Sequence, residues 1–187
     1  MTADNLFEIN ILNQHWLGTE PDQYDLCSHG QLKLIIGGQV ILDGREEYGL
    51  SETALALLRT VEQDHSPQNH VAEKLVFHGC GYVLMQGCAI GVDWTVEHDG
   101  SHVILKDVVR WDTPDEHRAT YFEGVTVSIS KAQYRQVVLS FAQEVKEFFE
   151  GQEKEFFNKE EQQAYEQFWQ EFNQLLQSTP DEKSPKS

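Results

Sequence analysis

Residues 90–111 constrain the fold more than any other part of the chain. Two runs rich in valine, isoleucine and tryptophan flank Asp99-Gly100, a dipeptide preferred in two-residue hairpin loops because both central positions need positive φ. A hairpin centred on that dipeptide pairs Val96 with Val103 and places Trp94 on the same apolar face, opposite a charged face. The sequence therefore predicts an antiparallel hairpin with Trp94 directed toward a core.

Asp107 is expected to interrupt this hairpin, because it would lie on the apolar face opposite Val92. The pairing should therefore bulge or end there. Other short runs of isoleucine, leucine and valine predict further strands at residues 8–12, 32–36, 39–43, 75–77, 82–85 and 125–129. Since strands that follow one another in a chain usually pair, we expect an antiparallel twisted sheet of about six to eight strands.

Helical patterns occur in the middle and in the C-terminal third of the chain. Ser51 is expected to cap a helix of about three turns that stops before Pro67. Ser130 and Gln133 form a capping-box pattern, and the apolar residues after it recur every three or four positions until Gly151. An apolar stripe of that width is expected to pack against one face of the sheet. The expected fold class is therefore α+β, with the sheet covered on one face by helices and a C-terminal helical extension.

The C-terminal extension begins with another capping pattern at Asn158. One unbroken helix over residues 131–177 is an alternative, but the apolar stripe lapses between Phe157 and Tyr165, so we prefer two helices. The aromatic face of the extension should either cover the parent domain or form a homodimer contact, because exposure of so large a patch favours aggregation. Its members are Tyr165, Phe168, Trp169 and Phe172.

The domain organisation follows from these patterns. Residues 1–151 are expected to form one α+β domain that includes a helix at 131–150, and residues 152–177 to form the C-terminal helix. We find no internal repeat. Residues 178–187 contain proline and polar side chains but no apolar residue, which predicts a disordered tail.

Charge argues against two classes of partner. The chain has 31 acidic and 14 basic residues and a formal charge of −17, so it repels nucleic-acid phosphates and anionic lipid. No apolar run approaches the roughly 20 residues that cross a bilayer. The first cation is Lys33, which argues against a secretory signal, and three cysteines fit reduced thiols better than a disulfide framework. We therefore expect a cytoplasmic protein that binds neither nucleic acid nor membrane.

The best candidate for a metal site is His78 with Cys80 and Cys88, since residues two apart on a strand point the same way and imidazole and thiolate both suit zinc. A fourth ligand and a Cys-x-x-Cys pair are missing, so we favour two structural thiols and expect no metal or other cofactor. The common nucleophile, phosphate-loop, zinc-protease and dinucleotide motifs are absent from the sequence. No residue is therefore assigned a catalytic role, and the sequence leans away from an enzyme.

Acidic turns next to possible aromatic anchors supply the remaining candidate site. Distributed acidity attracts a basic partner better than it transfers protons. The candidate partner-binding residues are Trp111, Asp112, Asp115, Glu116, Glu46 and Glu47. We expect an acidic protein-binding module of the immunity or inhibitor type that docks a basic protein. The alternative is a small-ligand-binding protein or enzyme with an unrecognised pocket, metal-dependent through His78, Cys80 and Cys88.

Overall fold

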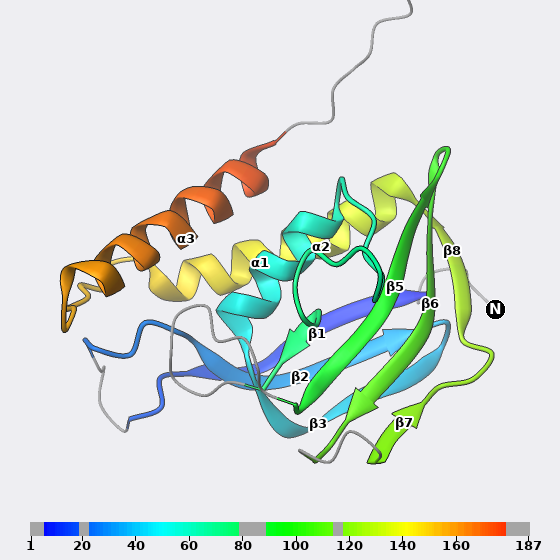
Figure 1. The fold of residues 1–187 in the computed structure, drawn as a ribbon, viewed down its shortest axis with the longest axis horizontal. Coiled ribbons are helices and arrows are strands. Elements are labelled where there is room, and N and C mark those ends of the chain that lie inside the picture. The colour runs from blue at the N-terminus through cyan, green and yellow to red at the C-terminus, as the bar shows by residue number, and fades with distance from the viewer. Residues whose placement is uncertain (1–5, 19–22, 79–88, 114–117, 179–187) are drawn as a thin grey trace, which may run out of the picture.

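The computed structural model describes residues 6–18, 23–78, 89–113 and 118–178 (Figure 1). Their fold is α+β, as the sequence predicts, with strands and helices in a simple order along the chain. The elements are β1 (Phe7–His15), β2 (His29–Ile36), β3 (Gln39–Gly49), α1 (Leu50–Thr60), β4 (Val76–Phe77), β5 (Gly91–Asp99), β6 (His102–Trp111), β7 (Ala119–Tyr121), β8 (Thr126–Ser130), α2 (Lys131–Phe149) and α3 (Lys159–Gln177).

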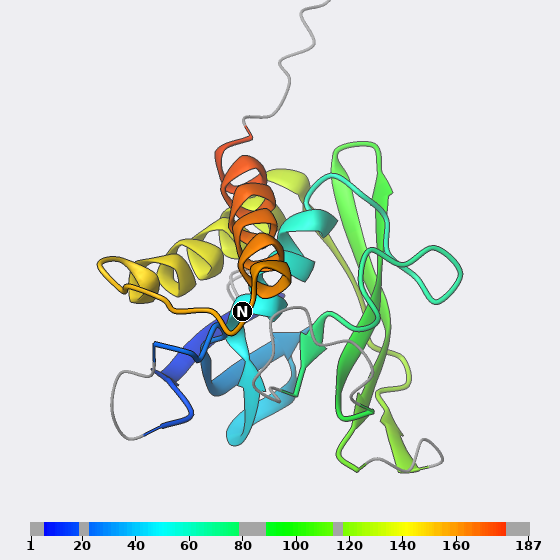
Figure 2. The same cartoon turned by 60° about the vertical axis from the view of Figure 1, so that its left-hand side comes forward.

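The eight strands form one antiparallel sheet in the order β1-β2-β3-β4-β5-β6-β7, with β8 also paired to β6. The two-residue strand β4 connects β3 to β5. Figure 2 shows that β1–β3 and the long β5–β6 hairpin lie at an angle to one another, with α1 in that angle. The sheet is therefore strongly bent, and one of its faces encloses the helices.

The helices begin close to the predicted positions. Ser130 and Gln133 form the expected capping box of α2, and the Asn158 side chain caps α3. α2 and α3 are separate helices, as predicted, and α3 lies on the outer side of α1 and α2 (Figure 1). The prediction that Ser51 caps α1 is wrong. Gly49 is the N-cap, and the Ser51 hydroxyl instead accepts the Ser28 N–H at 3.1 Å.

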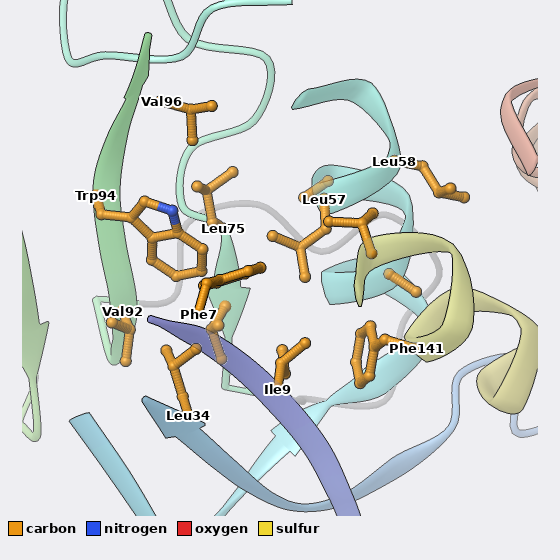
Figure 3. Packing of buried hydrophobic residues seen from close by; sticks show 14 of the residues in the cluster. Phe7, Ile9, Leu34, Leu57, Leu58, Leu75, Val92, Trp94, Val96 and Phe141 are labelled. Atoms are coloured by element: carbon orange, nitrogen blue, oxygen red, sulfur yellow. The ribbon is translucent and has the colours of Figure 1, made fainter. Parts of the chain in front are cut away.

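The core fills the space between the bent sheet and the helices (Figure 3). Phe7 from β1, Trp94 from β5 and Leu57 from α1 meet there, and Trp94 is 1% exposed, as the hairpin pattern predicts. Phe168 and Phe172 of α3 belong to the same cluster. The C-terminal helix is thus packed against the rest of the described chain.

The β5–β6 hairpin is present, but its loop is displaced by one residue from the predicted position. Asp99 pairs with His102, so the loop is Gly100-Ser101 and Val96 faces Leu105 instead of Val103. The reason lies at Gly100, which has φ 55° and takes the first loop position, the place that type II′ turns reserve for glycine. Because the partners of Thr95 to Asp99 each move by two positions on β6, the apolar face is unchanged in this part of the hairpin.

Candidate functional site

A trough of about 1110 Å³ lies on the face of the β5–β6 hairpin that points away from the helices. Asp93 alternates with core side chains along β5, and Val109 and Trp111 of β6 lie beside it. These residues form its floor. One wall comes from residues 67–74, between α1 and β4, and the other from residues 121–126, which join β7 to β8. We refer to this cavity as the trough.

A β-bulge at Asp107 shapes the floor of the trough. The pairing shifts between Asp93 and Thr95, which leaves β6 with one extra residue, so the predicted interruption at Asp107 is confirmed. Asp107 has φ 56° and an exposed side chain, whereas Val108 is 1% exposed and returns to the core. Aspartate tolerates this left-handed conformation better than most residues. The bulge therefore adds a carboxylate to the lining of the trough.

His65 fastens one wall of the trough to β5. Its backbone pairs with that of Val96 through two hydrogen bonds of 2.8 Å. The buried ring lies 2.9 Å from Asp93 through Nε2, and Nδ1 accepts the Val71 N–H at 3.1 Å. Asp93 also accepts the Leu75 N–H at 3.1 Å. Because the Val71 N–H can only donate, Nδ1 of His65 is an acceptor and the ring proton is on Nε2, where it points to Asp93. Both ring nitrogens are therefore occupied, and neither is left to accept a proton from a substrate.

The lining of the trough combines acidic and aromatic side chains with small apolar ones. The aromatic ones include Trp111, Tyr121 and Phe122. The charged ones are Glu73, Lys74, Asp93, Asp107 and Glu123. Four carboxylates and one ammonium leave three net negative charges among the described lining residues. Such a surface attracts cations and offers them aromatic faces.

A second cavity, of about 240 Å³, lies between β3 and the end of β6. Arg110 Nη1 donates to the Ile41 carbonyl at 2.7 Å, and its Nε lies 2.8 Å from Asp112 Oδ1. This guanidinium joins two strands that are not neighbours in the sheet. Burial, reinforced by the Asp112 carboxylate, raises the pKa of Tyr48 above its ordinary value, so that its hydroxyl stays protonated beside this cavity.

The sequence-predicted partner-binding residues are divided among several places. Trp111 lies in the trough, whereas Glu46 and Asp112 line the second cavity together. Because consecutive residues of a strand point to opposite faces, Trp111 and Asp112 open into different cavities at the end of β6. The structure thus brings Glu46 and Asp112 together from two distant turns, but in a different cavity from the aromatic residue.

Glu47 lies away from these cavities, on the other side of β3 from Glu46. Its Oε1 is 3.0 Å from Nε2 of His15, whose Nδ1 is 2.8 Å from the Trp16 carbonyl oxygen. Asp115 and Glu116 lie outside the described residues. Glu47 therefore has a partner within the chain, while these two acids cannot be placed.

Sequence reasoning missed Glu73, Glu123 and Phe122, which come from the two walls of the trough. They belong to segments far apart in the chain, and no periodic pattern relates them. One signal was available at Asp107, because an acid on the apolar face of a hairpin marks a bulge, and bulges often lie next to functional sites.

The predicted metal candidates fall mostly outside the described residues. His78 follows β4 and is partly buried, but Cys80 and Cys88 cannot be placed. Within the part of the chain that the structure describes, no group of three or more His, Cys, Asp and Glu side chains is arranged to hold a metal ion. Cys27 is buried, and burial raises the pKa of its thiol well above the ordinary value, which disfavours the nucleophilic thiolate.

The aromatic residues of α3 have two different environments. Phe168 and Phe172 are 4% and 0% exposed and pack within their own chain. Tyr165 and Trp169 line a shallow groove of about 510 Å³ between α2 and α3, together with Phe149. A homodimer contact at this helix remains a prediction. Of the four predicted contact residues, Tyr165 and Trp169 are the ones accessible to a second copy of the chain.

The chain matches no protein-family model, no curated protein and no solved structure. None of the helices that the structure describes has the length and apolar character needed to span a membrane.

Proposed function

We propose that the protein is a binding module that docks a basic protein partner in the trough. One observation carries this proposal, namely that Trp111 and four carboxylates line the same cavity beside a single ammonium. Complementary charge accelerates and orients association, and aromatic side chains supply contact area at low entropic cost. The partner would be a cationic toxin or enzyme, and the protein an inhibitor or immunity protein that acts in the cytoplasm.

The attachment of the wall to the floor also supports this proposal. The buried His65 ring and the Asp93 carboxylate hold that wall through hydrogen bonds of 2.9 to 3.1 Å. A binding surface that is ordered before association loses less conformational entropy on binding. The trough is therefore suited to recognise a partner without refolding.

A direct test uses a short labelled peptide in which arginine alternates with leucine. Binding is measured by fluorescence anisotropy, against a peptide with glutamate in place of arginine. The triple variant Glu73→Gln, Asp107→Asn, Glu123→Gln should weaken binding of the basic peptide by about tenfold, and added salt should reduce the difference.

The matched control neutralises three exposed acids outside the trough, by Glu144→Gln, Glu153→Gln and Glu155→Gln. It has the same net charge as the trough variant, so a general attraction between opposite charges would affect both equally. Equal weakening in the two variants, or equal binding of the basic and acidic peptides, would refute the proposed docking site.

A second candidate function is the binding of a small molecule, which the trough, at about 1110 Å³, is large enough to admit. Its carboxylates and the Trp111 ring would attract and contact a small organic cation. Thermal stabilisation by small organic cations, with no binding of the basic peptide, would favour this function over protein docking.

The metal-dependent form of that alternative rests on His78, Cys80 and Cys88. Elemental analysis of the purified protein tests it, with His78→Ala and Cys80→Ser as paired variants. A stoichiometric metal that is lost in both variants would support a metal site, and a metal-free protein that still binds the basic peptide would rule it out.

A further inference from the structure

Lys74 already places a cation on the aromatic floor of the trough. Its Nζ lies 5.1 Å from the centroid of the Trp111 ring, within the range of a cation–π contact. Lys74 is half-buried, and Trp111 is half-buried at the end of β6. The Trp111 ring is therefore a cation-binding face, and a side chain of the same protein is its occupant.

The chain makes room for Lys74 at Gly91, the residue that pairs with Trp111 across the two strands. A Cβ atom at Gly91 would lie 2.8 Å from Cδ of Lys74 and would overlap the Val76 carbonyl oxygen. The aliphatic part of Lys74 thus passes over the one position beside Trp111 that has no side chain. This placement directs the ammonium onto the ring.

The neighbouring residue keeps Lys74 in that position. The Leu75 N–H donates to the buried Asp93 carboxylate at 3.1 Å, which fixes the backbone directly after Lys74. The ammonium itself sits at the end of a flexible stem of methylene groups. The backbone is therefore held independently of the contact between the ammonium and the ring.

We infer that the Trp111 face is the subsite for one lysine or arginine side chain of the basic partner, and that Lys74 occupies it in the unbound protein as a competing cation. This inference rests on the proposed function. An incoming arginine stacks on an aromatic ring at least as well as lysine does, and its charge is favoured by Glu73, Asp107 and Glu123 around the trough. Binding then displaces Lys74 from the ring toward solvent.

The experiment measures the affinity of the same arginine–leucine peptide for two variants of Lys74. Lys74→Gln removes the competing cation and should tighten binding by about two- to fivefold, the equivalent of one exposed cation–π contact. Lys74→Arg keeps a cation on the ring and should not tighten it. Lys131→Gln, an exposed lysine outside the trough, controls for the change in net charge.

A double-mutant cycle with Trp111→Leu separates competition on the ring from general electrostatics. If Lys74 competes for the ring, Lys74→Gln should tighten binding in the wild-type background and leave it unchanged in the Trp111→Leu background. Thermal unfolding of each variant establishes that it is folded.

The outcomes distinguish the inference from the proposed function. Equal tightening by Lys74→Gln with and without Trp111, or equal tightening by Lys131→Gln, would overturn the competing-cation role while leaving the docking function intact. No binding of the peptide by the wild type or by any Lys74 variant would overturn both.

Discussion

The ring of His65 and the carboxylate of Asp93 form a buried pair, with 2.9 Å between Nε2 and Oδ1, that joins the wall of the trough to its floor. Replacing His65 by alanine removes the donor to Asp93 and the acceptor for the Val71 N–H. Because the Val71 N–H is then left unpaired and Asp93 keeps only the Leu75 N–H, we expect the free energy of unfolding to fall by about 2 to 4 kcal/mol in urea denaturation.

The control for this prediction is His70→Ala, an exposed histidine in the same wall. It should change the free energy of unfolding by no more than about 0.5 kcal/mol. Similar losses from His65→Ala and His70→Ala would show that the buried pair does not hold the wall.

The contacts of His15 predict a pH-dependent contribution to stability. The Trp16 carbonyl, opposed by partial burial and aided by Glu47, raises the pKa of His15 above its ordinary value of 6.5. A raised histidine pKa stabilises the fold fully below the unfolded-state pKa, and this contribution is lost as the pH rises through the folded-state pKa. The stability difference between wild type and His15→Gln should therefore be larger at about pH 6 than at about pH 8.

Urea denaturation at the two pH values checks this difference, with His102→Gln at the exposed hairpin turn as the control. A stability difference for His15→Gln that stays constant or grows with rising pH would contradict the proposed sign.

The left-handed conformation of Asp107, at φ 56°, predicts a specific order of substitutions. Asp107→Asn keeps a side chain that tolerates this region and should leave the free energy of unfolding nearly unchanged. Asp107→Ala should cost about 1 kcal/mol. Chemical denaturation of both variants measures the two effects, and equal stability of the alanine and asparagine variants would argue against strain at the bulge.

Gly91 is predicted to tolerate no side chain, because a Cβ there would overlap the Val76 carbonyl oxygen. Gly91→Ala should therefore destabilise the protein by about 2 kcal/mol or more. Gly38→Ala is the comparison, since Gly38 has φ 78° with no atom near its would-be Cβ and should cost only about 1 kcal/mol. Thermal unfolding of the pair measures the extra cost at Gly91, where lack of space adds to a φ of 158° that side chains rarely adopt, and equal costs for the two variants would contradict the prediction.

The predicted homodimer is tested on the half-buried residues of α3. Tyr165→Gln with Trp169→Gln should convert a dimer to a monomer in light scattering, because these side chains line the groove between α2 and α3. Phe172 is unsuitable for this test, since it is 0% exposed and its removal would damage the core. A wild-type protein that is already monomeric, or a variant with the same mass in solution as wild type, would rule out this contact.

Local patterns predicted the faces of the strands better than their pairing. Trp94 and Val96 were assigned to the core from a period of two, and that assignment does not depend on which residue of β6 lies opposite. The loop position depends on which residue takes the first place in the loop. The sequence allows Asp99 there, but in the structure Gly100 takes it with a positive φ. Ser51 is a second case in which a local pattern is overridden. It precedes a good helical pattern, but its hydroxyl accepts the Ser28 N–H instead of capping the helix.

The trough could not be predicted from sequence because it depends on how distant segments meet. The acidic residues next to Trp111 in the sequence indicate a binding surface, but Glu73 and Glu123 join Trp111 through the fold, from the two walls of the trough. Asp107 was recognised as an anomaly in strand pairing and not as a lining residue. Sequence periodicity relates residues along one helix or strand. The walls of the trough come from two connecting segments, which have no such periodicity.

The shortness of β4, which has two residues, affects how the two halves of the sheet are connected. Phe77 is the one residue of β4 paired with β3, at Gly49, so the backbone ladder is nearly broken between the two halves of the sheet. The Phe77 N–H also donates to Thr53 Oγ1 of α1 at 3.3 Å, so the helix spans the same junction. Cooperative units that share few backbone hydrogen bonds exchange their amide protons independently. Within the described residues, side-chain contacts therefore join the two halves more than strand pairing does, among them the Thr53 contact from α1 and the Arg110 bond to the Ile41 carbonyl.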